Sequence, residues 1–230
     1  MVVLEGTDWD AEEARVRRLG QAIGWLTTAV KFRGAILWDE AFSALAERYP
    51  DVEVDEVVTA LILRSDLGLC GMARATVDQR DYIISSDMKN MGDRDYLTDR
   101  VRKYQRARED IEPYWPSEAE AASDTFYEAT MERPEVRELI RYLDAHVPDG
   151  IDDMNYADNC WEYIASESLS SLGGVDPCVK SLEENLNFCD YPDRFFTLAR
   201  AALEALPDRL LAGHSPASLK MLQEGSGGRR

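Results

Sequence analysis

A histidine and a serine stand side by side in the stretch Gly213-His214-Ser215-Pro216. They have the residue types of a base and a nucleophile, but a serine nucleophile also needs an oriented base and an oxyanion hole. Adjacent residues at a helix start rarely point toward each other, and the chain has no G-x-S-x-G motif. We therefore interpret Ser215 as the N-cap of a last short helix, and His214 as a residue that packs against the chain reversal or hydrogen-bonds it.

Oxygen donors gather in the stretch PDGIDDMNYAD, residues 148–158. A calcium loop of the EF-hand type needs ligands at alternate positions, a glycine at the sixth and an acidic residue at the twelfth. This stretch lacks that glycine and its aspartates do not alternate. A solvated loop that leads into a helix N-cap is the favoured interpretation, with weak divalent-ion binding as the alternative.

The cysteines are far apart, with no CxxC pair, and they are most simply reduced thiols. Together with His146, three of them could supply four zinc ligands, but structural zinc sites usually pair their ligands at short spacing. We expect buried free thiols, no metal and no cofactor. The cysteines are Cys70, Cys160, Cys178 and Cys189.

One dense basic cluster lies between residues 100 and 108, where a helix would place Arg102 and Arg106 one turn apart with Lys103 nearby. These three residues are the candidate contacts for a phosphate group or a partner. Acidic residues flank the cluster, so that residues 91–112 hold six basic and six acidic side chains. A solvated helix with internal ion pairs is therefore the favoured interpretation.

Hydrophobic spacing predicts three helices and then a hairpin in the first third of the chain. Apolar positions recur at helical spacing over residues 10–34, 39–48 and 55–68. The period then changes, because residues 72–77 and 81–85 form two short, partly β-branched runs joined by a polar turn. Three helices followed by a hairpin is the element order of a winged-helix domain.

Beyond residue 86 the pattern is helical nearly to the end. Ser117 and Glu120 have the spacing of a capping box, and Leu139 and Phe196 lie in apolar stripes that predict core positions. The predicted fold is mainly α, with an N-terminal winged-helix-like domain that carries one small β-hairpin, followed by a helical C-terminal part. The expected divisions are a winged-helix-like domain (1–90), a charged connecting helix (91–112), a helical domain (113–222) and a flexible tail (223–230).

Composition favours a soluble chain with a real core. Hydrophobic residues make up 45% of the 230 residues, and 44 acidic against 26 basic residues give a formal net charge of −18. Such a surface repels nucleic acid and anionic membranes. No apolar run is long enough to span a bilayer, and the first residues lack the pattern of a signal peptide. We therefore expect a cytoplasmic protein without membrane contact.

Two segments resemble a family of uncharacterised bacterial proteins that often end in a SEC-C zinc motif. The first is KFRGAILWDEAFSALAERYP with the later VDEVVTALIL and DYIIS, and the second is FFTLARAALEALPDRLLAGHSPASL. In that family an F-x-x-L-x-x-A stretch precedes a G-H-[ST]-P-x-x-L closing motif, and zinc-binding cysteines follow. The resemblance extends over residues 31–219 and implies a fold without an established activity. No cysteine follows residue 219 here, so zinc binding is not carried over.

Three functions remain open from the sequence. A protein–protein interaction or adaptor module is favoured, because no catalytic constellation is visible and the surface is acidic; its protein partner is not identified, and a second copy of the chain is one candidate. A DNA-binding regulator is supported by the predicted element order alone. It is disfavoured because the third helix begins VEVDEVV and residues 1–90 hold ten basic and sixteen acidic residues. An enzyme whose site assembles from distant acidic residues and a histidine is the third hypothesis.

Overall fold

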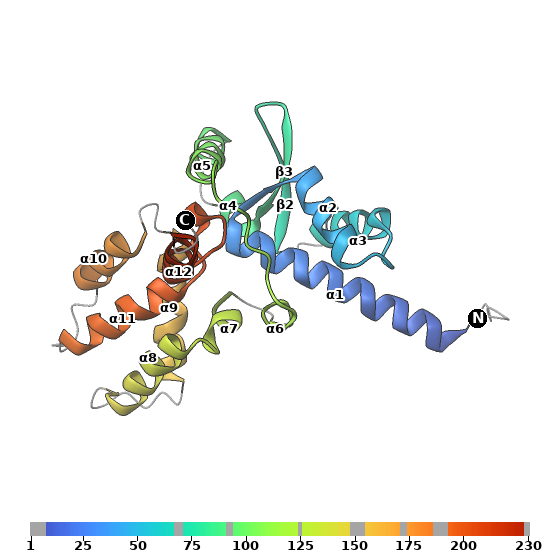
Figure 1. Cartoon of the computed structure of the whole chain (residues 1–230). Coiled ribbons are helices and arrows are strands. Elements are labelled where there is room, and N and C mark those ends of the chain that lie inside the picture. The colour runs from blue at the N-terminus through green and yellow to red at the C-terminus, as the bar shows by residue number, and fades with distance from the viewer. Residues whose placement is uncertain are drawn as a thin grey trace. The chain divides into compact units, whose positions relative to one another are not determined.

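The chain folds into two compact units in the computed structural model (Figure 1). The first unit is Met1–Val101 with Pro116–Ala122, and the second is Arg102–Trp115 with Ser123–Arg230. The structure describes residues 8–66, 71–90, 94–123, 126–147, 155–170, 174–185 and 193–227.

The first unit begins with a long helix, α1, which ends at Gly34. There the backbone turns to a φ of 72°, a conformation that glycine adopts without strain, and the Gly34 N–H donates to the Val30 carbonyl. The unit's elements are α1 (Trp9–Arg33), β1 (Ala35–Leu37), α2 (Trp38–Arg48), α3 (Val54–Asp66), β2 (Met72–Val77), β3 (Arg80–Ser85), α4 (Ser86–Asn90), the start of α5 (Arg94–Ala107) and α6 (Glu118–Ala121).

The three strands form an antiparallel sheet in the order β1-β3-β2. A two-residue turn joins β2 to β3, since Val77 pairs with Arg80. Asp78 and Gln79 both have positive φ, which matches the right-handed twist of a hairpin. The side chains of Tyr82, Ile83 and Ile84 on the central strand β3 are all buried, so both faces of the sheet are covered at this strand.

Residues 116–122 join the first unit through α1. The Trp25 side chain is 1% exposed, and its indole N–H donates to the Pro116 carbonyl over 3.0 Å. One residue earlier, Gly24 allows α1 and α6 to pack closely against each other. A Cβ at this position would lie only 3.3 Å from the Ala121 carbonyl oxygen. Short-range signals thus form the helices, and a buried hydrogen bond connects α1 to a segment 91 residues later in the chain.

Helices form the second unit, in which α8 packs against α9 and α11. Its centre holds large, fully buried side chains, among them Leu139, Trp161, Ile164 and Phe195. Its elements are the end of α5, α7 (Phe126–Met131), α8 (Pro134–Ala145), α9 (Tyr156–Ser170), α10 (Val175–Asn185), α11 (Asp193–Ala205), a 3-10 turn η1 (Arg209–Leu211) and α12 (Pro216–Gly227).

The mainly α fold with a small β-hairpin is confirmed, and so are the core position of Leu139 and the capping box at Ser117. Several details differ. Strand β1 forms outside the region expected to hold the sheet. The sequence also predicts that the helix capped by Ser117 carries Phe126 and Tyr127, but that helix ends at Ala121 and the two aromatic residues lie on the separate helix α7. Phe196 is half-buried beside the buried Phe195, whose ring it meets edge-on at 5.2 Å.

The units also divide the chain differently from the expected domains. The boundary falls inside α5, between Val101 and Arg102, and Pro116–Ala122 belongs to the first unit. Helix α12 continues to Gly227, into the stretch expected to be a flexible tail. In the part of the chain that the structure describes, no helix is long and apolar enough to cross a membrane.

Candidate functional site

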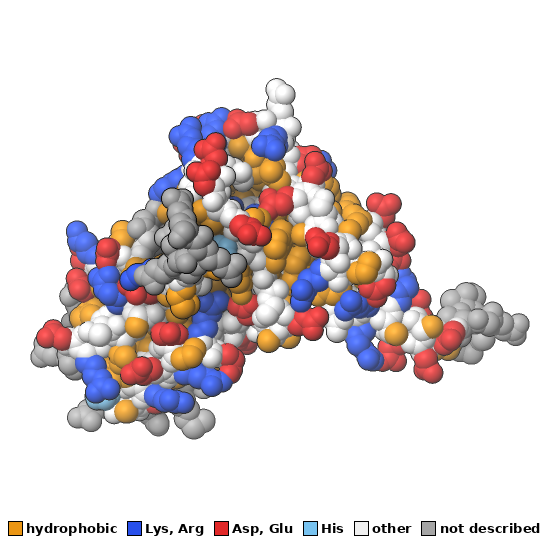
Figure 2. Space-filling model, viewed as in Figure 1, with side chains coloured by type: hydrophobic (Ala, Val, Ile, Leu, Met, Phe, Trp, Pro, Cys, Tyr) orange, Lys and Arg blue, Asp and Glu red, His pale blue; other side chains and the backbone are white. Residues whose placement is uncertain are grey.

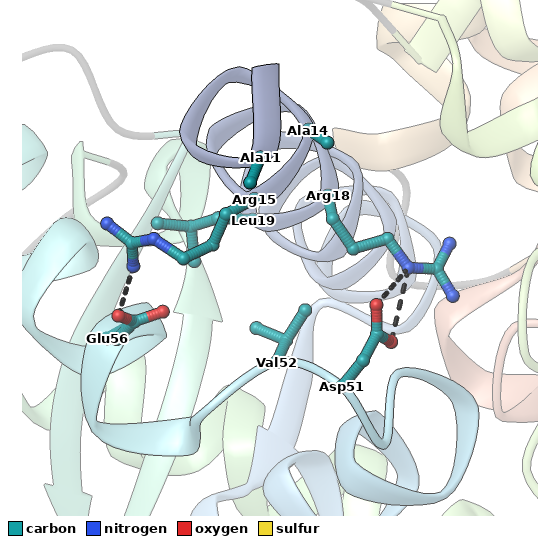
Figure 3. Close-up of a pocket in the computed structure, with 8 residues that line it drawn as sticks. All are labelled: Ala11, Ala14, Arg15, Arg18, Leu19, Asp51, Val52 and Glu56. Atoms are coloured by element: carbon teal, nitrogen blue, oxygen red, sulfur yellow. Dashed lines mark hydrogen bonds and ion pairs between the residues drawn. The ribbon is translucent and has the colours of Figure 1, made fainter. Parts of the chain in front are cut away.

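A hollow of about 450 Å³ lies in the first unit between α1 and the connection from α2 to α3 (Figure 3). Its floor is apolar, since Val52 is 8% exposed and Leu19 is half-buried beside it. The lining residues are Ala11, Ala14, Arg15, Arg18, Leu19, Asp51, Val52 and Glu56.

Two ion pairs bound this hollow on either side of Val52, as Figure 3 shows. Arg15 pairs with Glu56 of α3, and the Arg18 Nε lies 3.2 Å from a carboxylate oxygen of Asp51. Arg15 also holds both oxygens of Glu12, at 2.7 and 3.0 Å. The hydrogen bond from Arg15 lowers the pKa of the Glu12 carboxyl. Each arginine is therefore already matched by acidic partners on its own unit.

The lining residues include no serine, threonine, cysteine, lysine or histidine, and their two carboxylates, Asp51 and Glu56, are paired with arginines. A general acid or base needs a pKa close to the working pH, which for a carboxyl means a raised one, whereas the pKa of Glu12 beside the hollow is lowered. The hollow is an apolar floor between ion pairs, and such a surface fits an apolar side chain better than a reacting substrate.

Helix α3, which contributes Glu56 to the hollow, also has exposed residues beyond it. Asp55, Thr59 and Ile62 follow one another at helical spacing and are exposed, and Leu63 lies seven residues after Glu56, on the face that reaches Arg15. Ile62 and Leu63 are 56% and 59% exposed. The Thr59 hydroxyl donates its hydrogen bond to the Asp55 carbonyl of the same helix. We call Asp55, Thr59, Ile62 and Leu63 the α3 surface.

The hairpin that follows α3 also contains an ion pair, between Arg74 and Asp81. Arg74 lies 2.6 Å from Asp81, which also accepts the Thr76 hydroxyl at 2.7 Å. The hydrogen bond from Arg74, with that from Thr76, lowers the pKa of the Asp81 carboxyl. The Arg74 guanidinium also lies 5.2 Å from the centre of the Trp38 ring. The hairpin's exposed arginine on β2 therefore has an internal partner.

The basic cluster, which lies on α5 and extends to Arg108 just after it, separates into exposed and buried positions. Arg102, Lys103 and Arg106 are exposed, whereas Arg100 and Arg108 are 3% and 8% exposed. In the second unit the Arg108 guanidinium donates twice to the Arg209 carbonyl, at 2.8 and 2.5 Å, and stacks 5.0 Å from the Tyr104 ring centre. The three predicted contact residues thus share an exposed side of one helix, and Arg108 is a structural residue.

The Gly213–Pro216 stretch is a helix cap. The Ser218 N–H donates to the Ser215 hydroxyl oxygen at 3.1 Å, which confirms the predicted N-cap. The His214 Nε2 instead lies 2.9 Å from the Glu112 carbonyl oxygen, and its ring meets that of Tyr114 edge-on at 5.4 Å. The two side chains therefore do not form a nucleophile–base pair.

Asp208 precedes this cap and is half-buried in the second unit. Its carboxylate accepts the Leu210 N–H at 2.7 Å, and its own N–H donates to the His214 carbonyl at 2.9 Å. Burial raises the pKa of the Asp208 carboxyl, although the Leu210 N–H and the Arg108 charge act in the other direction. The hydrogen bonds of Asp208 hold the chain reversal in place, so the role of this carboxyl is structural. Its burial makes the charged form less favourable.

The cysteines and His146 do not assemble a metal site among the residues with described placement, which contain no group of three or more histidine, cysteine, aspartate or glutamate side chains suited to an ion. Cys178 is buried, and burial raises the pKa of its thiol to about 11. Cys160 is half-buried. His146 stacks on Tyr142 at 4.1 Å. Cys70, Cys189 and residues 148–154 lie outside the described residues.

Neither the ion-paired hollow nor the α3 surface was predicted from the sequence. Arg15 and Arg18 are spaced one turn apart, but their partners in the hollow, Glu56 and Asp51, lie 41 and 33 residues away respectively. The α3 surface had a visible signal, because the run VVTALIL holds more apolar residues than one buried face can take.

Comparison with known proteins gives no relatives. No family model matches the chain, and neither the curated proteins nor the solved structures contain a match. The resemblance to the SEC-C-associated family therefore stays a prediction.

Proposed function

We propose that this protein is a protein–protein interaction module whose winged-helix-like first unit binds a partner protein through the α3 surface. The observation that carries the proposal is the exposure of Ile62 and Leu63, each more than half accessible, on the third helix. Neighbouring large apolar side chains in water are typical of a binding surface. Figure 2 shows hydrophobic and acidic side chains close together over α2 and α3.

The partner we propose presents apolar side chains flanked by basic ones. Asp55 is exposed at the start of α3 and Glu53 just before it, so the apolar pair has acidic neighbours on its N-terminal side. Complementary charge around an apolar contact raises the association rate and suppresses wrong partners.

DNA is the alternative ligand, and the element order α1 β1 α2 α3 with a hairpin after α3 is the observation in its favour. A helix that reads DNA needs polar groups for base edges and cations for phosphates. The α3 surface instead offers one acid, two aliphatic side chains and a threonine whose hydroxyl donates to its own helix. The exposed Arg74 of the hairpin is paired with Asp81. These contacts support a protein partner over a duplex.

Affinity capture with the full chain tests the proposal. We compare the wild type with Ile62→Glu/Leu63→Glu in nuclease-treated host extract, and quantify every captured protein by mass spectrometry. The matched control is Met221→Glu/Leu222→Glu, which makes the same two changes at exposed apolar positions of α12. We expect one set of proteins to be retained by the wild type and the control and lost from the α3 variant. Equal capture by all three proteins would refute the proposal.

A further inference from the structure

A second exposed surface lies on α1. Figure 1 shows α1 continuing beyond α2 and α3 toward its N-terminal end. Trp9 and Val16 are 65% and 55% exposed there, and Gly20 is exposed with open space where a Cβ would stand. Spacings of seven and eleven residues return to nearly the same side of a helix. Trp9, Val16 and Gly20 therefore form one stripe, which we call the α1 stripe.

The α1 stripe points away from α3. Arg15 and Leu19, which line the hollow toward α3, lie on a different side of the helix from Trp9 and Val16 at 100° per residue. Trp9 and Val16 are therefore exposed among the described residues of the first unit. A tryptophan in water is costly for a monomer and is the residue type most enriched at the centres of interfaces.

Charge is sorted along the same part of α1. The first two turns are acidic and the next turn is basic, which makes the segment complementary to itself when two copies run antiparallel. The acidic residues are Asp8, Asp10, Glu12 and Glu13, and the basic ones are Arg15, Arg17 and Arg18.

We propose that α1 pairs antiparallel with α1 of a second copy of this chain. With the two-fold axis between residues 14 and 15, Trp9 of one copy lies against Gly20 of the other. The missing side chain at Gly20 lets the indole approach the helix backbone. The same register brings Glu13 of one copy next to Arg17 of the other, and a closed, isologous dimer results.

Arg17 and Glu13 are available for this pairing. Their side chains are 69% and 73% exposed, and the ion pair between them lies along one helix surface at 2.8 Å. Exposed pairs of this kind contribute little to a monomer, so the guanidinium can turn to an acid of the second copy at small cost. Arg15 and Arg18 stay with Glu56 and Asp51. The contact covers about three turns per copy, and we expect a weak, concentration-dependent dimer.

Sedimentation velocity over a broad concentration series of the full chain tests this dimer. We expect reversible dimerisation of the wild type. Trp9→Ala should raise the dimer dissociation constant at least about tenfold, and Met221→Ala, the same kind of truncation at an exposed residue of the second unit, should leave it unchanged. The second variant is Gly20→Gln. Glutamine favours the helix more than glycine does, so the helix itself should not be destabilised. The dimer should still weaken, because the new side chain fills the space that the indole of the other copy takes.

A charge exchange tests the antiparallel register. Glu13→Arg and Arg17→Glu each place like charges between the two copies and should weaken the dimer, whereas the double variant restores opposite charges and should recover it. A wild type that stays monomeric at every concentration would overturn the proposal, and so would a dimer that Trp9→Ala and Gly20→Gln leave intact. None of these variants changes the α3 surface, so failure of the dimer leaves the proposed partner binding separately testable.

Discussion

Replacing Trp25 by phenylalanine should separate α6 from α1 while leaving the second unit intact. The change removes the indole N–H that donates to the Pro116 carbonyl over 3.0 Å in a buried setting. Leaving a buried carbonyl without its donor costs about 1–3 kcal/mol. The five-membered ring is also lost from a site that is 1% exposed, and the cavity adds to the cost. Removing a whole tryptophan side chain costs about 3–5 kcal/mol, so we expect about 2–4 kcal/mol for Trp25→Phe.

Hydrogen exchange measured by mass spectrometry, alongside urea unfolding, resolves where that loss falls. The amides of residues 117–122 should lose protection, because the Pro116 contact holds this segment on α1. The matched control is Trp161→Phe, since Trp161 is fully buried in the second unit and its indole N–H donates to the Tyr127 carbonyl at 3.4 Å. That variant should affect α7 and α9 and spare residues 117–122. Unchanged protection of 117–122 in Trp25→Phe would refute the assignment of this segment to the first unit.

Three further outcomes follow from the contacts described. Because burial raises the pKa of Asp208, the folded state binds more protons than the unfolded one between the unfolded and the folded pKa, and stability falls as pH rises through that range. Asp208→Asn keeps an acceptor for the Leu210 N–H and should raise the thermal midpoint more at pH 7 than at pH 4; an equal rise at both would contradict this cause. In urea unfolding, Leu139→Ala should cost about 2–5 kcal/mol and the half-buried Phe196→Ala less; the reverse order would disprove the described core. In fluorescence anisotropy at about 150 mM salt, the full chain should not bind random-sequence or genomic duplex fragments; sub-micromolar binding that weakens steeply with salt would favour a DNA-binding regulator.

Local signals in the sequence predicted most of the helices. The end of α1 at Gly34 follows from glycine's freedom to adopt a positive φ, and the caps at Ser117 and Ser215 follow from side-chain hydrogen bonds within a few residues. The hairpin was visible as a change of hydrophobic period. These features depend on neighbours in the chain, so a single sequence contains them.

Features that depend on distant partners were not predictable in the same way. Strand β1 is three residues long and exists because Ala35 to Leu37 pair with β3, almost fifty residues later. Residues 116–122 belong to the first unit because Trp25 binds Pro116. The pairing of Arg18 with Asp51 likewise depends on how α2 turns into α3. Spacing alone does not encode such contacts.

The residues of the basic cluster differ in exposure although they are neighbours in the sequence. Its five cations look equivalent in the sequence, yet Arg108 is buried against the Arg209 carbonyl while Arg102, Lys103 and Arg106 stay exposed. The carbonyl that holds Arg108 lies about a hundred residues away. Exposure, which decides whether a charge can contact a partner, required the structure.

Photocross-linking from position 62 tests the central claim, that the α3 surface binds a protein, most directly. The full chain carries p-benzoylphenylalanine in place of Ile62 in host cells, and a parallel sample carries it in place of the exposed Glu47 of α2. After irradiation the adducts are treated with nuclease or with protease and resolved by mass. We predict a discrete adduct from position 62 that nuclease leaves intact, protease destroys and position 47 does not produce. An adduct that nuclease removes, or identical adducts from both positions, would contradict the claim.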